Sequence, residues 1–296
     1  MSMSDPHPPW AAVREAVTRA LAEDLLPLGD LSASLVAVGA GATAEVVCRG
    51  TGVLAGRRCA EEAFAQMDGS LVLHWAFDDG CAVGPGDVLC SVEGPLRSIL
   101  TAERTALNFL CQLSGVATLT RAFVEAAGAA SATTRILDTR KTTPGLRCLE
   151  KAAVRAGGGL NHRGSLSEGV MLKDNHLRGC SIASLVSEAF RRWPGRLVEV
   201  ECESPEQVSE AARAGATVVM CDNVSPAEVS ACVALLAGVS PRPLLEVSGR
   251  VSLDNVAAYA AAGADLISVG AITHSAAALD IGLDMVVDIG GLDMVE

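Results

Sequence analysis

One stretch of the sequence concentrates positively charged side chains. The residues 138–141 read Asp-Thr-Arg-Lys, residues 161–163 read Asn-His-Arg, and Lys173 follows. Between residues 135 and 173, eight lysines and arginines stand against three acids, a local charge of +5, whereas the whole chain carries −12. Arginine can hold a carboxylate or phosphate through two parallel hydrogen bonds, and lysine adds a compact charge. Because burying so many like charges without an anion is costly, the cluster predicts a site for a small ligand with several negative groups.

Two carboxylates, Glu201 and Asp222, end successive apolar runs of the sequence. Such groups can accept hydrogen bonds from sugar hydroxyls or hold Mg²⁺ through water. Carboxylates at strand ends also commonly cap the helix that follows, so these two alone leave both roles open.

Small residues follow two later apolar runs, at Ser248-Gly249 and at Gly270-Ala271. Backbone amides can approach a phosphate closely at such turns when they lie between a strand and a helix. The pair of turns predicts a phosphate site.

These residues follow a repeating pattern of short apolar runs and helical segments from about residue 130 onward. Six runs are followed directly by polar residues or glycine: 136–137, 170–172, 197–200, 218–221, 244–247 and 266–269. The segments SPEQVSEAARAGA and SLDNVAAYAAAGA, which begin at Ser204 and Ser252, have a serine N-cap and a closing glycine. Repeated βα units predict a parallel barrel, in which functional groups gather at the carboxyl ends of the strands.

The first hundred residues predict a separate α+β domain, with scattered strands and the turn 84–87. A long helical pattern from about residue 98 to 127 joins the halves, and its Arg104 is either a surface charge or a functional group. The chain is long enough for one large α/β domain and a smaller companion. Its charge disfavours nucleic acid, and no apolar run suits a membrane span or a secretory signal. We therefore expect a soluble, cytoplasmic protein.

The motifs that carry these residues resemble those of the quinolinate phosphoribosyltransferase family. They are TAERTALNFLCQLSGVAT, DTRKTTPGLRCLEKAAVRAGGGLNHR, VMLKDNH, VEVECES and CDN. The resemblance extends in order from about Glu23 to Met285. It implies an α/β protein with an N-terminal α/β sandwich domain (1–115) and an open, incomplete α/β barrel (116–275). A C-terminal helix (276–296) is expected to return to the first domain.

The resemblance also implies an activity: phosphoribosyl transfer from phosphoribosyl pyrophosphate to quinolinate, with decarboxylation, in NAD biosynthesis. The residues expected around the two carboxylates of quinolinate are Arg104, Arg140, His162, Arg163 and Lys173. Lys141 is expected at the phosphates, Glu201 and Asp222 at the ribose hydroxyls and a water-bridged metal, and Ser248, Gly249 and Gly270 at the 5′-phosphate. Lys141, Lys173, Glu201 and Asp222 are expected to act in catalysis.

Further expectations concern cofactors and assembly. The resemblance implies Mg²⁺ bound with phosphoribosyl pyrophosphate, no organic cofactor, and a homodimer, alone or within a larger oligomer, in which Arg104 completes the neighbour's site. Two positions depart from the family: Arg250 follows Ser248-Gly249 where glycine is usual, and Ala152 stands where tyrosine is usual. Arg250 either adds a cation to the phosphate site or crowds the turn. A phosphoribosyltransferase for another acceptor, and a non-catalytic anion-binding barrel, therefore stand as alternatives.

Overall fold

A computed structural model of the chain describes residues 5–177 and 179–286. These residues form two compact units. The first contains the chain up to residue 119, residues 143–157 and the chain from residue 276; the second contains residues 120–142 and 158–275. Residues 143–157, which the predicted barrel domain (116–275) included, group with the first unit; the predicted boundary at residue 115 stays a prediction.

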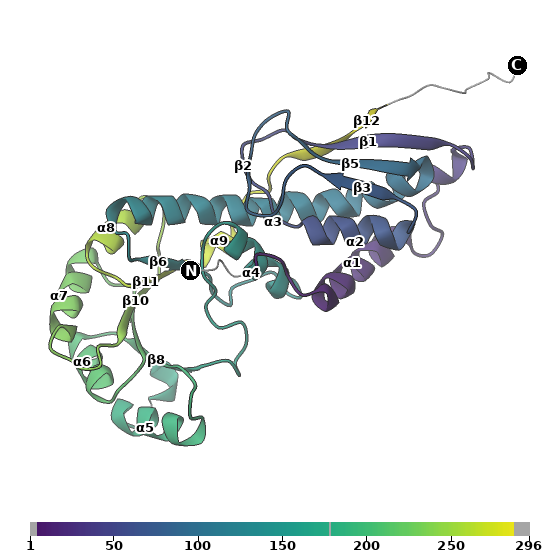
Figure 1. The fold of residues 1–296 in the computed structure, drawn as a ribbon. Coiled ribbons are helices and arrows are strands. Elements are labelled where there is room, and N and C mark those ends of the chain that lie inside the picture. Colours follow the sequence, from purple (N-terminus) through teal and green to yellow (C-terminus); the bar gives the residue numbers. More distant parts are fainter. Residues whose placement is uncertain (1–4, 178, 287–296) are drawn as a thin grey trace, which may run out of the picture. The chain divides into compact units, whose positions relative to one another are not determined.

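The second unit is built on six parallel strands (Figure 1). Their order across the sheet is β6 (Arg135–Leu137), β11 (Leu266–Ser268), β10 (Leu244–Ser248), β9 (Val218–Asp222), β8 (Val198–Cys202) and β7 (Val170–Leu172). Within residues 5–177 and 179–286, no strand pairing joins β6 to β7, so the ring of strands is open. The predicted open α/β barrel is confirmed.

Helices alternate with these strands, and those that follow β7, β8, β9 and β10 lie on the outer side of the strands in Figure 1. They are α5 (Ile182–Arg192), α6 (Pro205–Arg213), α7 (Pro226–Leu236), α8 (Val256–Ala261) and the short α9 (Ala271–His274), with a 3₁₀ turn, η2 (Asp174–His176), after β7. Ser204 caps α6 as predicted, because its side chain accepts a hydrogen bond from the amide of Gln207. Ser252 does not cap α8 in this way, since that helix begins later, at Val256.

The first unit is built on a four-stranded antiparallel sheet. Its order is β12 (Ile281–Val286), β1 (Gly41–Cys48), β5 (Val88–Pro95) and β3 (Val72–Trp75), and β2 (Gly52–Val53) pairs separately with β4 (Ala82–Val83). The helical elements are α1 (Trp10–Leu25), η1 (Ala33–Leu35), α2 (Arg57–Met67), the start of α3 (Leu96–Ala130) and α4 (Arg147–Ala156). The inward side chains Ala44, Val46 and Cys48 of β1 are buried, as expected for a sheet covered on one face.

The C-terminal segment corrects a prediction. Residues 276–296 were expected to form a helix, but Ile281–Val286 is the strand β12, which pairs antiparallel with β1 from Cys48↔Ile281 to Thr43↔Val286. Pairing with β1 supplies the backbone of this segment with interstrand partners from Ile281 to Val286, which outweighs its helix-forming residues. Residues 287–296 lie outside the described part of the chain.

The helix α4 groups with the first unit. It stands between β6 and β7 in sequence, where a barrel helix is expected, but it packs against α1 of the first unit. The neighbouring residue Gly145 adopts a φ of +82° beside the guanidinium of Arg19, so the chain enters the first unit before the helix begins.

Among the described residues, no helix is both long and apolar enough to cross a bilayer.

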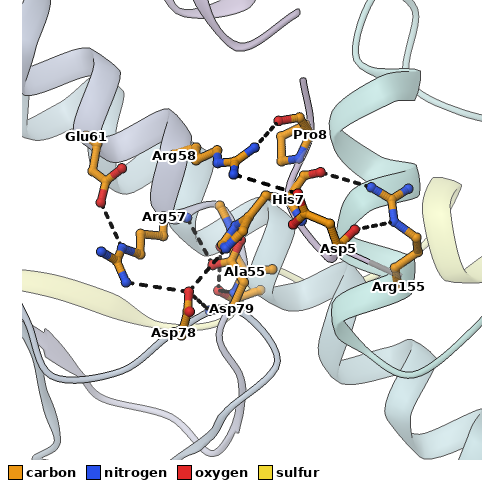
Figure 2. Close-up of polar contacts among 12 residues, drawn as sticks. Asp5, His7, Pro8, Ala55, Arg57, Arg58, Glu61, Asp78, Asp79 and Arg155 are labelled. Carbon is orange, nitrogen blue, oxygen red and sulfur yellow. Dashed lines mark hydrogen bonds and ion pairs between the residues drawn. The ribbon is translucent and has the colours of Figure 1, made fainter. Parts of the chain in front are cut away.

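The N-terminal residues 5–8 bind the rest of the first unit through charged side chains (Figure 2). His7 places its Nδ1 3.1 Å from Asp79 and its Nε2 3.3 Å from Asp78. Arg155 of α4 donates to the carbonyl oxygens of Asp5 and His7, at 2.9 and 3.1 Å. Asp79 also accepts the amides of Gly56 and Arg57 at the start of α2, so one buried carboxylate serves both the segment and the helix.

Candidate active site

A cavity of about 380 Å³ lies at the carboxyl ends of the barrel strands. Eight of the predicted site residues line it: Arg140, Lys141, His162, Arg163, Lys173, Glu201, Asp222 and Ser248. All of them belong to the second unit. The structure thus gathers the basic cluster and both strand-end carboxylates around one space.

The carboxylates and the serine are placed by the ends of three adjacent strands. Asp222 and Ser248 are the last residues of β9 and β10 and lie opposite each other in the parallel register. Glu201 is the next-to-last residue of β8. Because the side chains of a strand alternate between its faces, these positions fix which side chains reach the cavity.

Asp138 joins the two loops that carry most of the cations. It is fully buried directly after β6 and accepts a hydrogen bond from the amide of His162 at 2.8 Å and one from the side chain of Asn161 at 2.6 Å. The loop with Arg140 is thereby held to the loop with Arg163. A buried carboxylate that accepts several hydrogen bonds is a strong local anchor.

The loop around Lys141 is held by hydroxyl groups. The amide of Lys141 donates to Thr139 Oγ1 at 3.0 Å, and Thr273 of α9 donates its hydroxyl to the carbonyl oxygen of Lys141 at 2.8 Å. The residue itself is exposed. Its ammonium group is therefore presented to solvent at the cavity by a fixed backbone.

Lys173 and Glu201 form an ion pair within the cavity. Lys173 follows β7 directly, and its side chain is 43% exposed, against 15% for Glu201. An anionic ligand that enters the cavity will compete with Glu201 for this ammonium group.

Arg163 is partly buried and lies beside a second guanidinium, that of Arg140. Its guanidinium donates to the carbonyl oxygen of Gly169 at 3.0 Å. Burial lowers the pKa of Arg163 from its usual value; the carboxylate of Glu199 opposes this shift, and the neighbouring guanidinium of Arg140 adds to it. A bound carboxylate would relieve the repulsion between the two arginines.

His162 lines the cavity, but both of its ring nitrogens face protein groups. Nδ1 accepts the amide of Arg163 at 2.8 Å, and Nε2 lies 2.9 Å from a carboxylate oxygen of Glu199. Nε2 is also 3.8 Å from Glu246. The predicted position of His162 beside a ligand therefore stays a prediction, and any contact through a ring nitrogen would require the ring to turn.

Sequence reasoning missed three buried acids that support the site: Asp138 as an anchor, and Glu199 and Glu246 inside the barrel. The available signal was an acid within an otherwise apolar strand, as in Val-Glu-Val-Glu-Cys and Leu-Leu-Glu-Val-Ser. Burial, first of all, and the charge of Glu199 raise the pKa of Glu246 to about 8, against the opposing effects of His162 and a hydrogen bond from Ser268.

The predicted phosphate turn requires glycine at Gly249. Its φ is +88°, and a Cβ there would lie 2.4 Å from Asn223 Oδ1. Arg250, which follows it, has a φ of +50°, is exposed, and is not among the residues that line the cavity. At the second turn, a Cβ on Gly270 would lie 3.2 Å from the side chains of Lys141 and His274.

Two residues named in the sequence analysis lie in the first unit: the predicted site residue Arg104, and Ala152, which departs from the family pattern. Arg104 is on α3, with its side chain 67% exposed and 3.9 Å from Glu103. Ala152 is buried in α4. The residues that line the cavity belong to the second unit. The expectation that Arg104 completes the site of a neighbouring chain remains a prediction.

The chain matches both family models of one enzyme family. Residues 30–114 match the quinolinate phosphoribosyl transferase N-terminal domain, and residues 116–284 match the C-terminal domain. The chain belongs to the quinolinate phosphoribosyltransferase family.

Relatives from distant organisms match this family member over most of its length. It is 40% identical over 280 residues to the nicotinate-nucleotide pyrophosphorylase (carboxylating) of Mycobacterium leprae, which covers 93% of this chain and 97% of the relative. It is 36% identical over 299 residues to the quinolinate phosphoribosyltransferase (decarboxylating) 1b of Nicotiana tabacum, covering 94% and 83%.

Solved structures of the family share its fold. The nicotinate-nucleotide pyrophosphorylase from Francisella tularensis superimposes with a TM-score of 0.89 at 37% identity, covering 94% of this chain and 97% of that one. This quinolinate phosphoribosyltransferase family member therefore carries its basic cavity on the fold that other members use.

Proposed function

We propose that this chain transfers the phosphoribosyl group of phosphoribosyl pyrophosphate to quinolinate and releases pyrophosphate and CO₂, leaving nicotinate mononucleotide. One observation carries the proposal: in a member of this family, a single cavity combines two arginines and two lysines with the carboxylates of Glu201 and Asp222. Cations suit the charges of both substrates, and carboxylates suit the ribose between them.

The acid substrate is assigned to Arg140, Arg163 and Lys173. Two guanidinium groups and one ammonium group match a pyridine ring with adjacent carboxylates, because each arginine can bind one carboxylate with two hydrogen bonds. The Lys173–Glu201 ion pair opens when the acid arrives, which transfers Lys173 to the substrate and leaves Glu201 available to the ribose.

The phosphoribosyl donor is assigned to the opposite groups of the cavity. Lys141 meets the pyrophosphate, Glu201 and Asp222 accept hydrogen bonds from the ribose hydroxyls, and Ser248 with the backbone of Gly249 and Gly270 receives the 5′-phosphate. The close packing of Gly249 against Asn223 supports this role, since it keeps the turn free of any side chain of its own.

Glu201 and Asp222 also fit Mg²⁺. Their carboxylates supply the hard oxygen atoms that this ion prefers, and Mg²⁺ keeps several waters when protein offers only one or two carboxylates. When bound, the ion supplies positive charge that offsets the charge of the pyrophosphate.

The reaction follows from the charges around the cavity. The bond from the ribose C1 to pyrophosphate breaks, and both of its electrons leave with the pyrophosphate beside Lys141. Glu201 and Asp222 stabilise the positive charge that develops on the sugar. The pyridine nitrogen then bonds to C1 and becomes cationic. That ring accepts the electron pair released when the 2-carboxylate leaves as CO₂, and C2 takes up a proton. Positioning two polyanions together supplies much of the acceleration.

A coupled assay tests the activity. Purified protein receives Mg²⁺, phosphoribosyl pyrophosphate and either quinolinate or nicotinate, and CO₂ and nicotinate mononucleotide are measured. Product and CO₂ from quinolinate alone support the proposal. Turnover with nicotinate alone would instead indicate a changed acceptor, and binding without pyrophosphate release would indicate a sensor.

The homodimer and the role of Arg104 belong to the same proposal. Arg104 is strongly exposed on α3, and we place it in the site of a neighbouring chain. Mixing R104A with K141A tests this. Both variants are expected to be nearly inactive alone. A mixed dimer regains one complete site of two, so an equal mixture that pairs at random should recover about a quarter of wild-type activity. No recovery from exchanging dimers would place Arg104 in its own chain's site.

A further inference from the structure

Two glutamates lie inside the barrel, each on the amino-terminal side of a cavity residue of the same strand. Glu199 is two residues before Glu201 on β8, and Glu246 is two residues before Ser248 on β10, so each faces the same side of its strand as a cavity residue. Glu199 is 6% exposed and Glu246 is 1% exposed. Barrel interiors are normally filled by branched apolar side chains, and carboxyl groups are rarely buried without a specific partner. Their presence therefore calls for a reason.

Both glutamates converge on the imidazole of His162. Nε2 lies 2.9 Å from Glu199 Oε2 and 3.8 Å from Glu246 Oε2. The hydroxyl of Ser268 donates to the other oxygen of Glu246 at 2.5 Å and fixes that carboxyl group in place. The carboxyl oxygens and the ring nitrogen lie within 4.8 Å of one another.

The spacing of this trio suits a metal ion, but its hydrogen bonding does not. The amide of Arg163 donates to Nδ1 of His162 at 2.8 Å, so Nδ1 carries no proton. The proton of the imidazole must then be on Nε2, the atom that faces the glutamates. A metal on Nε2 would leave the ring without any proton, whereas histidine ligands normally keep one on the second nitrogen. Nε2–H therefore donates to Glu199.

The same ring is tied to the loop that forms the acid site. The amide of His162 is bound by Asp138, and the amide of Arg163 is bound by the ring. Arg163 then extends its guanidinium into the cavity wall. A rotation of the imidazole would break the hydrogen bond to the amide of Arg163 and release the backbone that carries it.

We propose that Glu199 and Glu246 are positioning residues for this reaction: they hold His162 in one orientation and one tautomer, and so fix the backbone that presents Arg163 to the acid substrate. The identity of that substrate rests on the proposed function, but the state of the imidazole does not. The two tests below separate these claims.

Nitrogen NMR of the imidazole tests the first claim. The chain has five histidines, so protein labelled with ¹⁵N-histidine gives few signals, and the His162→Gln variant assigns one of them. We expect the proton of the imidazole to be on Nε2, with Nδ1 unprotonated as the acceptor of the Arg163 amide. A proton on Nδ1 overturns the proposal.

Steady-state kinetics test the second claim. Glu199→Leu and Glu246→Leu remove the carboxyl groups at similar volume, and we expect the KM for quinolinate to rise roughly tenfold or more, with the KM for phosphoribosyl pyrophosphate changed less than about twofold. Glu199→Gln retains an acceptor for Nε2–H and should recover most of the loss. Glu201→Gln, on the same strand, is the matched control: it should lower activity without changing the His162 signals.

The outcomes separate the proposals. If the leucine variants fold and keep both the wild-type His162 signals and the wild-type KM for the acid, the positioning role is wrong; altered signals with an unchanged KM also contradict it. Should a leucine variant fail to fold, the wild-type spectrum and Glu199→Gln still decide, since loss of Nε2–H in Glu199→Gln would contradict the assigned donor. A wild-type protein inactive with quinolinate refutes the function but leaves the NMR result standing.

Discussion

The amide of His162 donates to the buried carboxylate of Asp138 at 2.8 Å, and this hydrogen bond joins the loop after β6 to the loop before β7. The two loops carry Arg140 and Arg163, so one acid that never lines the cavity organises both sides of its basic wall.

Replacing Asp138 should therefore impair both stability and function. Asp138→Ala removes the buried carboxylate that accepts hydrogen bonds from Asn161 and His162, which we expect to lower the free energy of unfolding by roughly 3 kcal/mol and to reduce kcat/KM for the acid. Urea unfolding and initial rates measure the two effects. Thr134→Val is the control, because its buried hydroxyl donates to the carbonyl of Ala264 at the other end of β6; it should cost stability alone. Equal effects of both variants on kcat/KM would contradict the organising role.

Arg250 adopts a left-handed backbone conformation that a side chain disfavours, with a φ of +50°. Arg250→Gly removes this strain, and after the extra entropy of glycine in the unfolded chain we expect a net gain of roughly 0.5 to 1 kcal/mol. Thermal unfolding measures it, with Arg250→Ala as a control that keeps the strain and should gain nothing.

The same two variants distinguish the roles considered for Arg250. If its guanidinium served as an additional cation for the 5′-phosphate, both substitutions would raise the KM for phosphoribosyl pyrophosphate. We expect neither to do so, because the side chain is exposed and does not line the cavity.

Glu246 should make stability depend on pH. Its pKa is raised from 4.5 to about 8 in the folded chain, first by burial and then by Glu199. The folded state thus holds a proton that the unfolded state releases, and this contribution is complete below pH 4.5 and is lost as pH rises through about 8. The free energy of unfolding of wild type relative to Glu246→Gln should fall by at most about 1.4 kcal/mol per pH unit in that window. Parallel pH profiles would show that the carboxyl group stays ionised.

His7 should also make the stability of the first unit fall as pH rises, beginning at a higher pH than the effect of Glu246. Its hydrogen bond to Asp79, first, and the charges of Asp79 and Asp78 raise its pKa, against burial and Arg58. The stabilisation is therefore complete below about pH 6.5, the unfolded value, and is lost as pH rises through the folded pKa. The stability difference between wild type and His7→Ala should shrink over this range in thermal unfolding. His74→Ala, at an exposed position of β3, should show no such trend.

The sequence was sufficient to predict the barrel and its functional edge because both depend on local patterns. Apolar runs that end in Asp222 or Ser248 place those residues at strand ends, and parallel strands bring their ends together. The cation cluster was predictable for the same reason, since Arg140 and Lys173 each follow a strand at a short distance.

Other features depend on partners distant in sequence and could not be read locally. Ile281–Val286 becomes a strand only because β1 offers it a free edge. The helix α4 joins the first unit because α1 covers it, although its sequence position suggests the barrel. Glu246 is an acid in an otherwise apolar strand, and its contacts with Ser268 and His162, which explain its position, come from distant parts of the sequence.

The pairing of β12 with β1 also sets an order for synthesis on the ribosome. The partners Cys48 and Ile281 lie at opposite ends of the chain, so the N-terminal sheet must wait with an open edge while the whole barrel is translated. The barrel, whose strands lie between residues 135 and 268, has all its parts before that edge strand is made. The sheet of the first unit can therefore be completed only after the barrel strands have been synthesised, through a long-range contact that carries a loop-closure cost.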